Sequence, residues 1–284
     1  MLRRFEVHRA GSVDEAVALR QRFGDEGAIY AGGTELLLAM KLGVARWPHL
    51  IDIKTISGLG EISVSGNILR IGATATHWDL ERDPSVARAI PAFTLLEQRV
   101  ANIRVRAAGT IAGNIAFAEP HADPPAFLAA LGAVIVIEGS RGTRRLSIDE
   151  FLTGMYQTAL GPDELIIAIE IPIPDARLKL AYVKFQILER PSVGVAIVAD
   201  VRNGLFAAAP VVVVGAVDEV PRRVTTDGLL GADPRDPGAG EALAEAARAA
   251  VDPVADLAGS VEYKRHTVGV FARRALAAAL GEAA

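Results

Sequence analysis

Short strand-like runs alternate with amphipathic helical runs between residues 5 and 172 of this chain. Apolar runs of strand length at residues 28–31 and 50–53 flank a helical pattern at 34–42, and Ser12 followed by Glu15 favours a helix start before residues 13–23. Each helical stripe and each strand face must be buried against another element. The alternation therefore predicts a mixed fold in which helices pack on sheet.

The pattern changes after residue 60. Strand-like runs at 61–64 and 68–71 flank Ser65-Gly66-Asn67, which predicts a hairpin, and a second hairpin should pair 133–138 with 144–146. Helices are predicted at 79–89, 92–100 and 124–131. Arg104 and Arg106 alternate with apolar neighbours, which indicates the solvent face of a strand. A strand at 166–171 ends at Pro172-Ile173-Pro174, which we interpret as a domain boundary.

Beyond this boundary, strands precede helices. Strand-like runs at 180–186, 193–201, 205–208 and 211–217 are followed by a region rich in Gly, Pro and Asp, and then by alanine-rich helical runs at 241–250 and 260–280. This order is typical of an α+β domain in which helices cover one face of a sheet. The length of 284 residues agrees with two domains, since one domain commonly holds about 100–200 residues.

Composition excludes several kinds of chemistry. No cysteine is present, which excludes disulfides, thiolate nucleophiles and protein-held iron–sulfur clusters. The five histidines are far apart in sequence and form no metal-binding motif, so we predict no metal site. A formal charge of −4 with interspersed signs does not indicate nucleic-acid binding. The apolar runs are too short to cross a bilayer and the start lacks a signal-peptide core, so we expect a cytoplasmic protein.

Two glycine-bearing turns are candidates for a ligand site. The first is Ala31-Gly32-Gly33-Thr34-Glu35, between a strand and a helix, and the second is Gly109-Thr110-Ile111-Ala112-Gly113-Asn114. Glycine lets the backbone approach a ligand closely, and free amides at a helix start attract phosphate. Neither turn contains Lys or Arg, so the pair fits a pyrophosphate held by backbone amides. Each turn alone is also explained as an ordinary loop, with Thr34 capping the next helix.

Three other polar residues have structural explanations that we favour over functional ones. Asp123 precedes Pro124-Pro125 and an apolar run, which is typical of a helix N-cap, although its carboxylate would also suit ligand hydroxyls. His77 is interpreted as a packed or exposed side chain. Lys184 alternates with apolar neighbours and is interpreted as an exposed strand lysine. Since no hydrolytic triad or carboxylate pair stands out, a bound cofactor is expected to supply any redox step.

Longer stretches resemble one family. Residues 1–175 contain, in order, the strings AGGTELLLAMKLG, IDIKTISGLGEI, LRIGATATHWDL, VRAAGTIAGNIAFAEPHADPPAFLAALGA and RLSIDEFLTGMYQTALGPDELI, and KFQILERPSVGVAIVAD follows. Together they resemble the FAD-binding medium subunit of molybdenum hydroxylases of the carbon monoxide dehydrogenase/xanthine dehydrogenase type. The resemblance implies an α+β fold: a two-subdomain FAD-binding domain of the PCMH/vanillyl-alcohol-oxidase type at 1–175 (subdomains 1–57 and 58–175), then a smaller α+β domain at 178–284.

The resemblance also implies a site and an activity. Family glycine loops hold the FAD pyrophosphate and ribityl chain, and an aspartate and a lysine match Asp123 and Lys184. The implied FAD-binding residues are Ala31, Gly32, Gly33, Thr34, Glu35, Thr110, Ile111, Ala112, Gly113, Asn114, Asp123 and Lys184. FAD passes electrons from the [2Fe–2S] clusters of a small subunit to NAD+, a quinone or oxygen, while a large molybdopterin subunit oxidises the substrate. The implied oxidoreductase is a dimer of heterotrimers whose molybdopterin and clusters belong only to the partners.

Two positions depart from the family pattern. Ala112 stands where the second loop usually has glycine, and Ala107 stands where asparagine is usual. A Cβ at Ala112 is expected to cost about 1 kcal/mol if the backbone there has a positive φ. Two alternatives therefore stay open: a scaffold subunit whose flavin site has decayed, and a stand-alone FAD reductase on the same fold.

Overall fold

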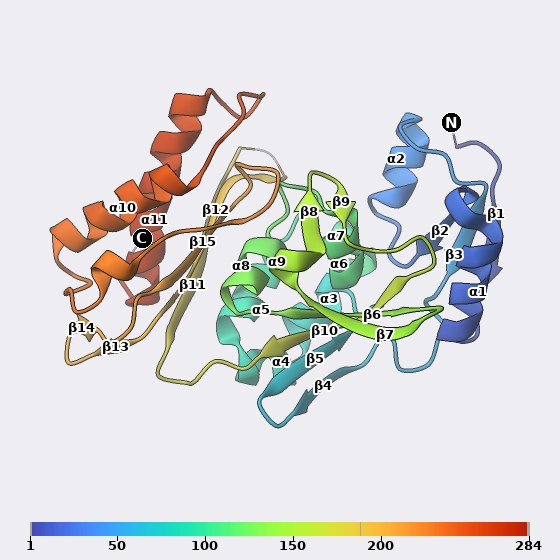
Figure 1. The fold of residues 1–284 in the computed structure, drawn as a ribbon, viewed down its shortest axis with the longest axis horizontal. Coiled ribbons are helices and arrows are strands. Elements are labelled where there is room, and N and C mark those ends of the chain that lie inside the picture. Colours follow the sequence, from blue (N-terminus) through green and yellow to red (C-terminus); the bar gives the residue numbers. More distant parts are fainter. Residues whose placement is uncertain (1, 188, 283–284) are drawn as a thin grey trace. The chain divides into compact units, whose positions relative to one another are not determined.

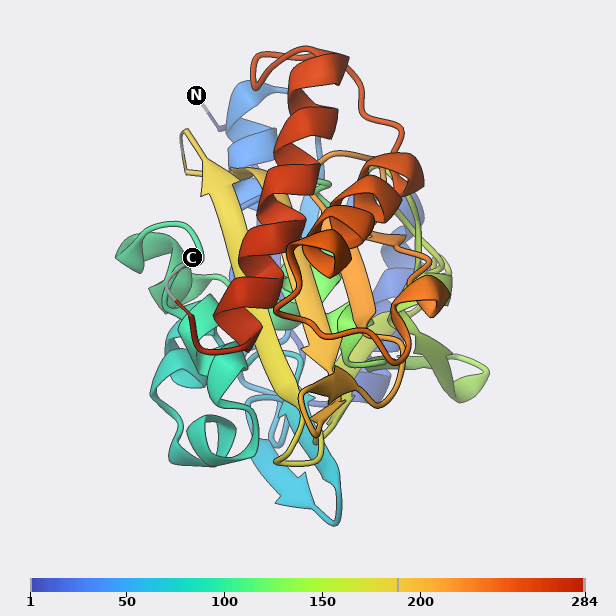
Figure 2. The same cartoon turned by 90° about the vertical axis from the view of Figure 1, so that its left-hand side faces the viewer.

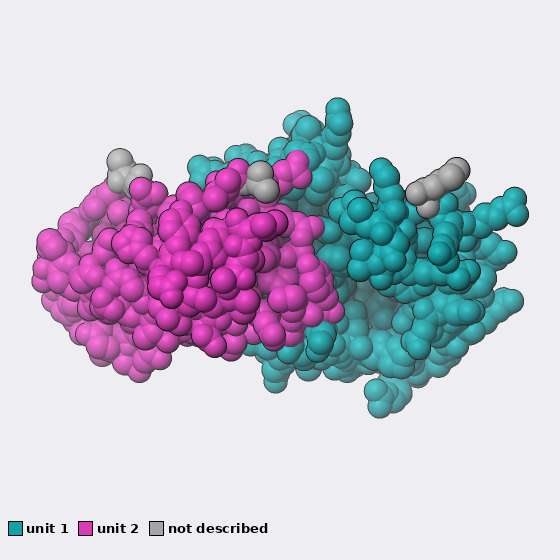
Figure 3. Space-filling model, turned by 90° about the horizontal axis from the view of Figure 1, so that it is seen from above, with its two compact units in different colours: residues 1–118, 133–153, 157–172 teal, residues 119–132, 154–156, 173–284 magenta. Residues whose placement is uncertain are grey.

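The computed structural model describes residues 2–187 and 189–282, and the chain divides into two compact units (Figure 1). Unit 1 comprises residues 1–118, 133–153 and 157–172 (Figure 3). Unit 2 comprises residues 119–132, 154–156 and 173–284. The division is therefore not a single cut, because the segment 119–132 packs with the C-terminal region although it interrupts unit 1 in sequence.

Unit 1 begins with a three-stranded parallel sheet. β1 (Glu6–Arg9) and β2 (Gly27–Tyr30) both pair with the central β3 (His49–Asp52). α1 (Val13–Phe23) and a 3₁₀ turn (Gly24–Glu26) precede β2, and α2 (Leu36–Leu42) follows it. The Ser12 hydroxyl accepts the Glu15 amide as predicted, but the Glu15 carboxylate accepts the Gly11 amide rather than closing a reciprocal box with Ser12.

A five-stranded antiparallel sheet forms the rest of unit 1, in the order β4-β5-β10-β6-β7. Its strands are β4 (Ile62–Ser65), β5 (Ile68–Gly72), β6 (Val134–Gly139), β7 (Gly142–Ser147) and β10 (Leu165–Pro172). Both predicted hairpins, β4–β5 and β6–β7, are confirmed. In the first of them Gly66 has a φ of 57°, which glycine adopts without a side-chain clash.

Short helices connect β5 to β6: α3 (His77–Arg82), α4 (Pro84–Ala89), α5 (Pro91–Glu97), α6 (Ile103–Ala108) and α7 (Ile111–Phe117). After β7 come α9 (Ile148–Phe151) and two short paired strands, β8 (Leu152–Gly154) and β9 (Gln157–Thr158). The helix predicted at 79–89 is in fact two helices. Asp83 ends α3, and its carboxylate accepts the amides of Ser85 and Val86 to begin α4 at Pro84.

The prediction of a strand around Arg104 and Arg106 is wrong, because these residues lie in α6. The Asn102 side chain accepts the amides of Arg104 and Val105 and so begins the helix. Arg106 Nε then lies 2.7 Å from Glu81 Oε2.

Unit 2 contains a four-stranded antiparallel sheet in the order β11-β12-β15-β16. Its strands are β11 (Lys179–Gln186), β12 (Pro191–Ala199), β15 (Val211–Gly215) and β16 (Arg222–Arg223), with a separate hairpin of β13 (Val201–Arg202) and β14 (Leu205–Phe206). As predicted, helices cover one face, where α10 (Pro237–Ala250) and α11 (Val261–Ala279) lie across the strands (Figure 2). A 3₁₀ turn (Asp227–Leu229) precedes α10.

The other face of this sheet is covered by α8 (Pro124–Ala130), in which every residue is buried. A Cβ built on Gly215 would lie 3.0 Å from the Ala126 Cβ, whereas Val212 and Val214 pack into the core beneath α10 and α11. Successive strand residues point to opposite faces, so α8 and the α10–α11 pair sandwich the sheet.

Candidate functional site

The first glycine turn connects β2 to α2. Gly33 has a φ of 73°, a left-handed backbone that favours glycine. Within the described residues, the amides of Gly32, Gly33 and Thr34 donate no hydrogen bond to the protein. Thr34 does not cap α2, because the N-cap position is Glu35 and no side-chain hydrogen bond closes that helix start. The three amides are therefore free to bind an anionic group.

The second glycine turn is the start of α7. Thr110 is the N-cap, and its Oγ1 accepts the Gly113 amide at 3.0 Å. Ala112 is buried in ordinary helical backbone without a positive φ, so the condition for the cost of about 1 kcal/mol at its Cβ is not met. The Asn114 Oδ1 atom is buried and accepts no hydrogen bond from the described residues. A buried acceptor of this kind requires a donor, such as a ligand hydroxyl.

The two turns meet backbone to backbone within unit 1. A Cβ on Gly32 would lie 2.7 Å from the Gly109 Cα and closer still to the Ala108 carbonyl oxygen. A Cβ on Gly109 would lie 2.9 Å from the Val105 carbonyl oxygen and 3.3 Å from the Thr34 Oγ1. Only glycine allows this approach, because carbon and oxygen atoms of neighbouring segments do not normally come so close. The structure thus brings together two motifs that the sequence separates by more than seventy residues.

A buried histidine–glutamate pair supports the second turn, and sequence reasoning did not find it. His77 Nδ1 lies 2.6 Å from Glu97 Oε2, and both side chains are buried. The His77 amide donates to the Gly109 carbonyl at 3.0 Å, and Thr76 forms a β-bridge with Thr110. His77 is therefore packed rather than exposed, and it fixes the backbone where the two turns meet. No spacing rule links His77 to Glu97, so the sequence offered no signal for the pair.

In unit 2, Asp123 is bonded to two side chains of β11. The Tyr182 hydroxyl donates to Oδ1 at 2.9 Å, and Lys184 Nζ lies 3.0 Å from Oδ2. Asp123 stands at the N-cap position of α8 as predicted, but its side chain forms no cap hydrogen bond there. The Lys184 side chain is only 7% exposed, so its interpretation as an exposed lysine is wrong. Burial, the negative charge of Asp123 and the hydrogen bond together raise the pKa of Tyr182 well above its ordinary value.

Gly194 on β12 leaves the space that the Tyr182 side chain occupies. It stands opposite Lys184 in the β11–β12 register. A Cβ there would lie 3.1 Å from the Tyr182 Cζ and closer still to its hydroxyl oxygen. The tyrosine can therefore cross the strand and reach Asp123 only because position 194 has no side chain.

Glu119 is the centre of a second charged cluster in unit 2. Its carboxylate accepts a hydrogen bond from the Tyr156 hydroxyl at 2.7 Å, pairs with Arg190, and lies 3.0 Å from His121 Nδ1. Burial raises the pKa of Glu119, but hydrogen bonds from His121 and Tyr156 and the Arg190 charge outweigh burial and lower it to about 2. Burial and the Glu119 contact raise the pKa of Tyr156 to about 12. The sequence offers no signal for this cluster, because Tyr156 and Arg190 come from segments distant from Glu119 and His121.

Residues 3–174 match the family model described as the FAD binding domain in molybdopterin dehydrogenase. The chain belongs to this family. Residues 189–279 also match the CO dehydrogenase flavoprotein C-terminal domain. These matches confirm the resemblance, the α+β fold with an FAD-binding domain followed by a C-terminal domain, and FAD as the cofactor.

Proteins similar over almost the whole chain agree with this membership. The carbon monoxide dehydrogenase medium chain of Hydrogenophaga pseudoflava is 34% identical over 97% of this chain and 97% of its own length. The nicotine 6-hydroxylase medium subunit of Paenarthrobacter nicotinovorans is 26% identical over 89% of each. A structure of Cu,Mo-CO dehydrogenase superposes with a TM-score of 0.95 at 30% identity over 100% of both chains. The chain is thus an oxidoreductase subunit, the FAD-binding medium subunit of a molybdenum hydroxylase.

Quinoline 2-oxidoreductase from Pseudomonas putida 86 also superposes, with a TM-score of 0.94 at 29% identity over 99% of each chain. The fold is therefore shared by family members named for different substrates. Among residues 2–187 and 189–282, no helix has the length and apolar character needed to cross a membrane.

Proposed function

We propose that this subunit takes electrons from the [2Fe–2S] clusters of a small partner subunit and passes them through FAD to an external acceptor, which is NAD+, a quinone or oxygen. Bound FAD supplies the redox chemistry, since it accepts and releases electrons and the side chains of this chain do not. The observation that carries the proposal is the contact between the two glycine turns. Where the turns meet, three amides and one buried amide oxygen have no hydrogen-bond partner among the described residues of the chain.

The residues of this chain bind and orient the cofactor. We assign FAD phosphate oxygens to the amides of Gly32, Gly33 and Thr34, and a ribityl or ribose hydroxyl to the Asn114 Oδ1 atom. The Gly113 and Asn114 amides already donate to Thr110, so the second turn contributes a side chain and a closely approaching backbone rather than further amides. The remaining proposed contacts are those implied by the family resemblance: Ala31, Glu35, Thr110, Ile111, Ala112, Gly113, Asp123 and Lys184.

Partner subunits follow from the composition and from the relatives. Cysteine thiolates hold [2Fe–2S] clusters in most proteins, and this chain has none. Relatives of similar length are named as medium chains or subunits. We therefore propose a complex with a large molybdopterin subunit and a small two-cluster subunit, assembled as a dimer of heterotrimers, in which residues 1–175 bind FAD and 178–284 form the C-terminal domain.

Flavin retention by two aspartate variants tests the binding site. Gly33→Asp places a carboxylate beside the proposed phosphate position and should abolish FAD retention by like-charge repulsion. Gly43→Asp is the matched control, because Gly43 also has a positive φ but lies at the far end of α2 with open space around it. The FAD content of each purified chain is measured by absorbance after acid release. Stoichiometric FAD in Gly33→Asp would rule out the first-turn assignment, and a wild-type chain that takes up no FAD would favour a scaffold role.

Electron transfer is tested in the assembled complex. With the Gly33→Asp chain, substrate should still reduce the clusters of the small subunit, but reduction of the external acceptor should stop. The two steps are followed separately. The spectrum of the clusters reports their reduction, and the absorbance of NADH formed from NAD+, or of a quinone dye, reports reduction of the acceptor. Acceptor reduction at the wild-type rate in a flavin-free complex would show that electrons leave by another route.

A further inference from the structure

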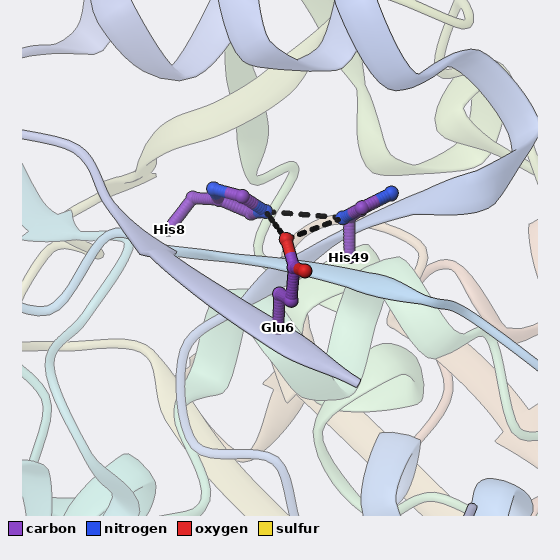
Figure 4. Close-up of side chains that lie close together, drawn as sticks. All are labelled: Glu6, His8 and His49. Carbon is purple, nitrogen blue, oxygen red and sulfur yellow. Dashed lines mark hydrogen bonds and ion pairs between the residues drawn. The ribbon is translucent and has the colours of Figure 1, made fainter. Parts of the chain in front are cut away.

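Three side chains with metal-binding atoms lie together on the parallel sheet of unit 1 (Figure 4). Glu6 and His8 are alternate residues of β1, so both point to the same face of the sheet. His49 stands directly opposite Glu6 in the β1–β3 register. The sequence hides this arrangement, because His8 and His49 are 41 residues apart and belong to no local motif.

The three atoms form a triangle of the size that a small metal ion needs. His8 Nε2 lies 3.1 Å from His49 Nδ1, and Glu6 Oε2 lies 3.7 Å from the first nitrogen and 3.6 Å from the second. A point about 2.0 Å from all three atoms exists at the centre of the triangle, and Zn²⁺ binds imidazole nitrogen at about 2.0–2.1 Å and carboxylate oxygen at about 2.0–2.2 Å.

The two imidazole rings are held in place by a neighbouring aromatic side chain. The His49 ring stacks on Phe23 with centroids 4.0 Å apart and an angle of 16°, and the His8 ring centroid lies 4.6 Å from the same Phe23 ring. The rings are mostly buried, whereas the Glu6 side chain is 73% exposed. The nitrogens are thus fixed before an ion arrives, and an ion can enter from the solvent side through Glu6.

We propose that Glu6, His8 and His49 bind one Zn²⁺ ion, with water in the fourth position, and that this ion ties the N-terminal strand β1 to β3. Two imidazoles and one carboxylate suit a first-row transition metal of borderline softness, whereas Mg²⁺ and Ca²⁺ prefer oxygen ligands throughout. Without metal, a hydrogen bond joins His8 Nε2 to His49 Nδ1.

Calorimetric titration of Zn²⁺ into the full-length chain, purified with a chelator that is then removed, tests this proposal. We expect one ion per chain. His8→Gln and His49→Gln should each weaken binding by more than about 100-fold, beyond the loss usual for a residue that only supports a ligand. His266→Gln is the matched control, since it removes an exposed histidine from α11 in unit 2. It should leave the affinity unchanged.

Substitution by Co²⁺ gives a second readout that does not depend on stability. A tetrahedral site with two nitrogen ligands should produce intense visible absorption in the wild type and in His266→Gln, and this absorption should be lost in His8→Gln and His49→Gln. Circular dichroism confirms that each variant is folded. Zinc binding that survives both substitutions, a wild type that binds no ion, or a Co²⁺ spectrum of an octahedral aquo ion would overturn the proposal.

Discussion

Gly32→Ala adds one methyl group where the two glycine turns meet. The new Cβ would lie 2.7 Å from the Gly109 Cα, whereas ordinary contacts begin at 3.4 Å, so the turns must separate by at least about 0.7 Å, and by more to clear the Ala108 carbonyl oxygen. Overpacking of this kind costs about 1–3 kcal/mol. Both neighbours, Gly109 and Ala108, present backbone atoms that cannot rotate away. We therefore expect the free energy of unfolding to fall by about 3 kcal/mol, at the upper end of this range.

The same separation should weaken FAD binding. In the proposed site FAD is held by the amides of the first turn and by the Asn114 Oδ1 atom of the second, so a hydrogen bond of about 2.9 Å to that oxygen, lengthened by about 0.7 Å or more, is no longer a hydrogen bond. A buried acceptor left without its donor costs about 1–3 kcal/mol, which weakens affinity by about 10-fold. Urea denaturation measures the stability of the Gly32→Ala chain, and flavin fluorescence during titration of the apoprotein measures its affinity for FAD.

Gly43→Ala controls for the general cost of replacing a glycine in this region. Gly43 has a φ of 78° and no atom within 4 Å of a built Cβ, so alanine there should cost only about 1–2 kcal/mol of backbone strain and leave FAD binding unchanged. The reasoning is refuted if Gly32→Ala keeps the urea midpoint and the FAD affinity of the wild type, because the two turns then do not touch.

Three further predictions concern side chains near the two turns and in unit 2. Asp123→Asn leaves the buried Lys184 ammonium without its carboxylate and should lower the free energy of unfolding by about 3–5 kcal/mol in urea denaturation. Glu119 has a pKa of about 2 in the folded chain, compared with an ordinary value of 4.5. Its contribution to stability is therefore complete above pH 4.5 and is lost as the pH falls towards 2. Glu119→Gln should make the urea midpoint change less with pH over that range. Thr110→Ala removes the cap of the Gly113 amide and should cost about 1 kcal/mol, most of which Thr110→Ser should restore by the same assay.

Helices and strands that are determined by interactions between residues close together in the sequence could be predicted from it. The β4–β5 hairpin follows from Gly66 between two alternating runs, and α1 begins where Ser12 meets the Glu15 amide. The strand prediction around Arg104 was wrong because α6 has only six residues. In so short a segment, apolar residues spaced with the helical period of 3.6 cannot be distinguished from those spaced with the strand period of 2. The Asn102 side chain decides the outcome there by bonding two amides, and its role was overlooked.

The features of the candidate site also differ in whether neighbouring residues in the sequence predict them. The glycine turns were found because a strand, two glycines and a helix start are adjacent in sequence. The pairs His77–Glu97 and His8–His49 join residues 20 and 41 positions apart, so only the folded chain brings them together. A sequence pattern can therefore locate the two glycine turns, but it does not show which side chains support them.

Lys184 shows why alternation alone misleads. Polar and apolar residues alternate along β11, and one polar face was assigned to solvent. In unit 2, however, α8 covers the sheet face opposite α10 and α11, and Lys184 lies on the α8 face, in register with Gly194 and Gly215. A buried ammonium is tolerated only when a partner offsets the loss of hydration. Asp123, at the start of α8, is that partner for Lys184, and the same helix that buries the lysine thus also supplies its counter-charge.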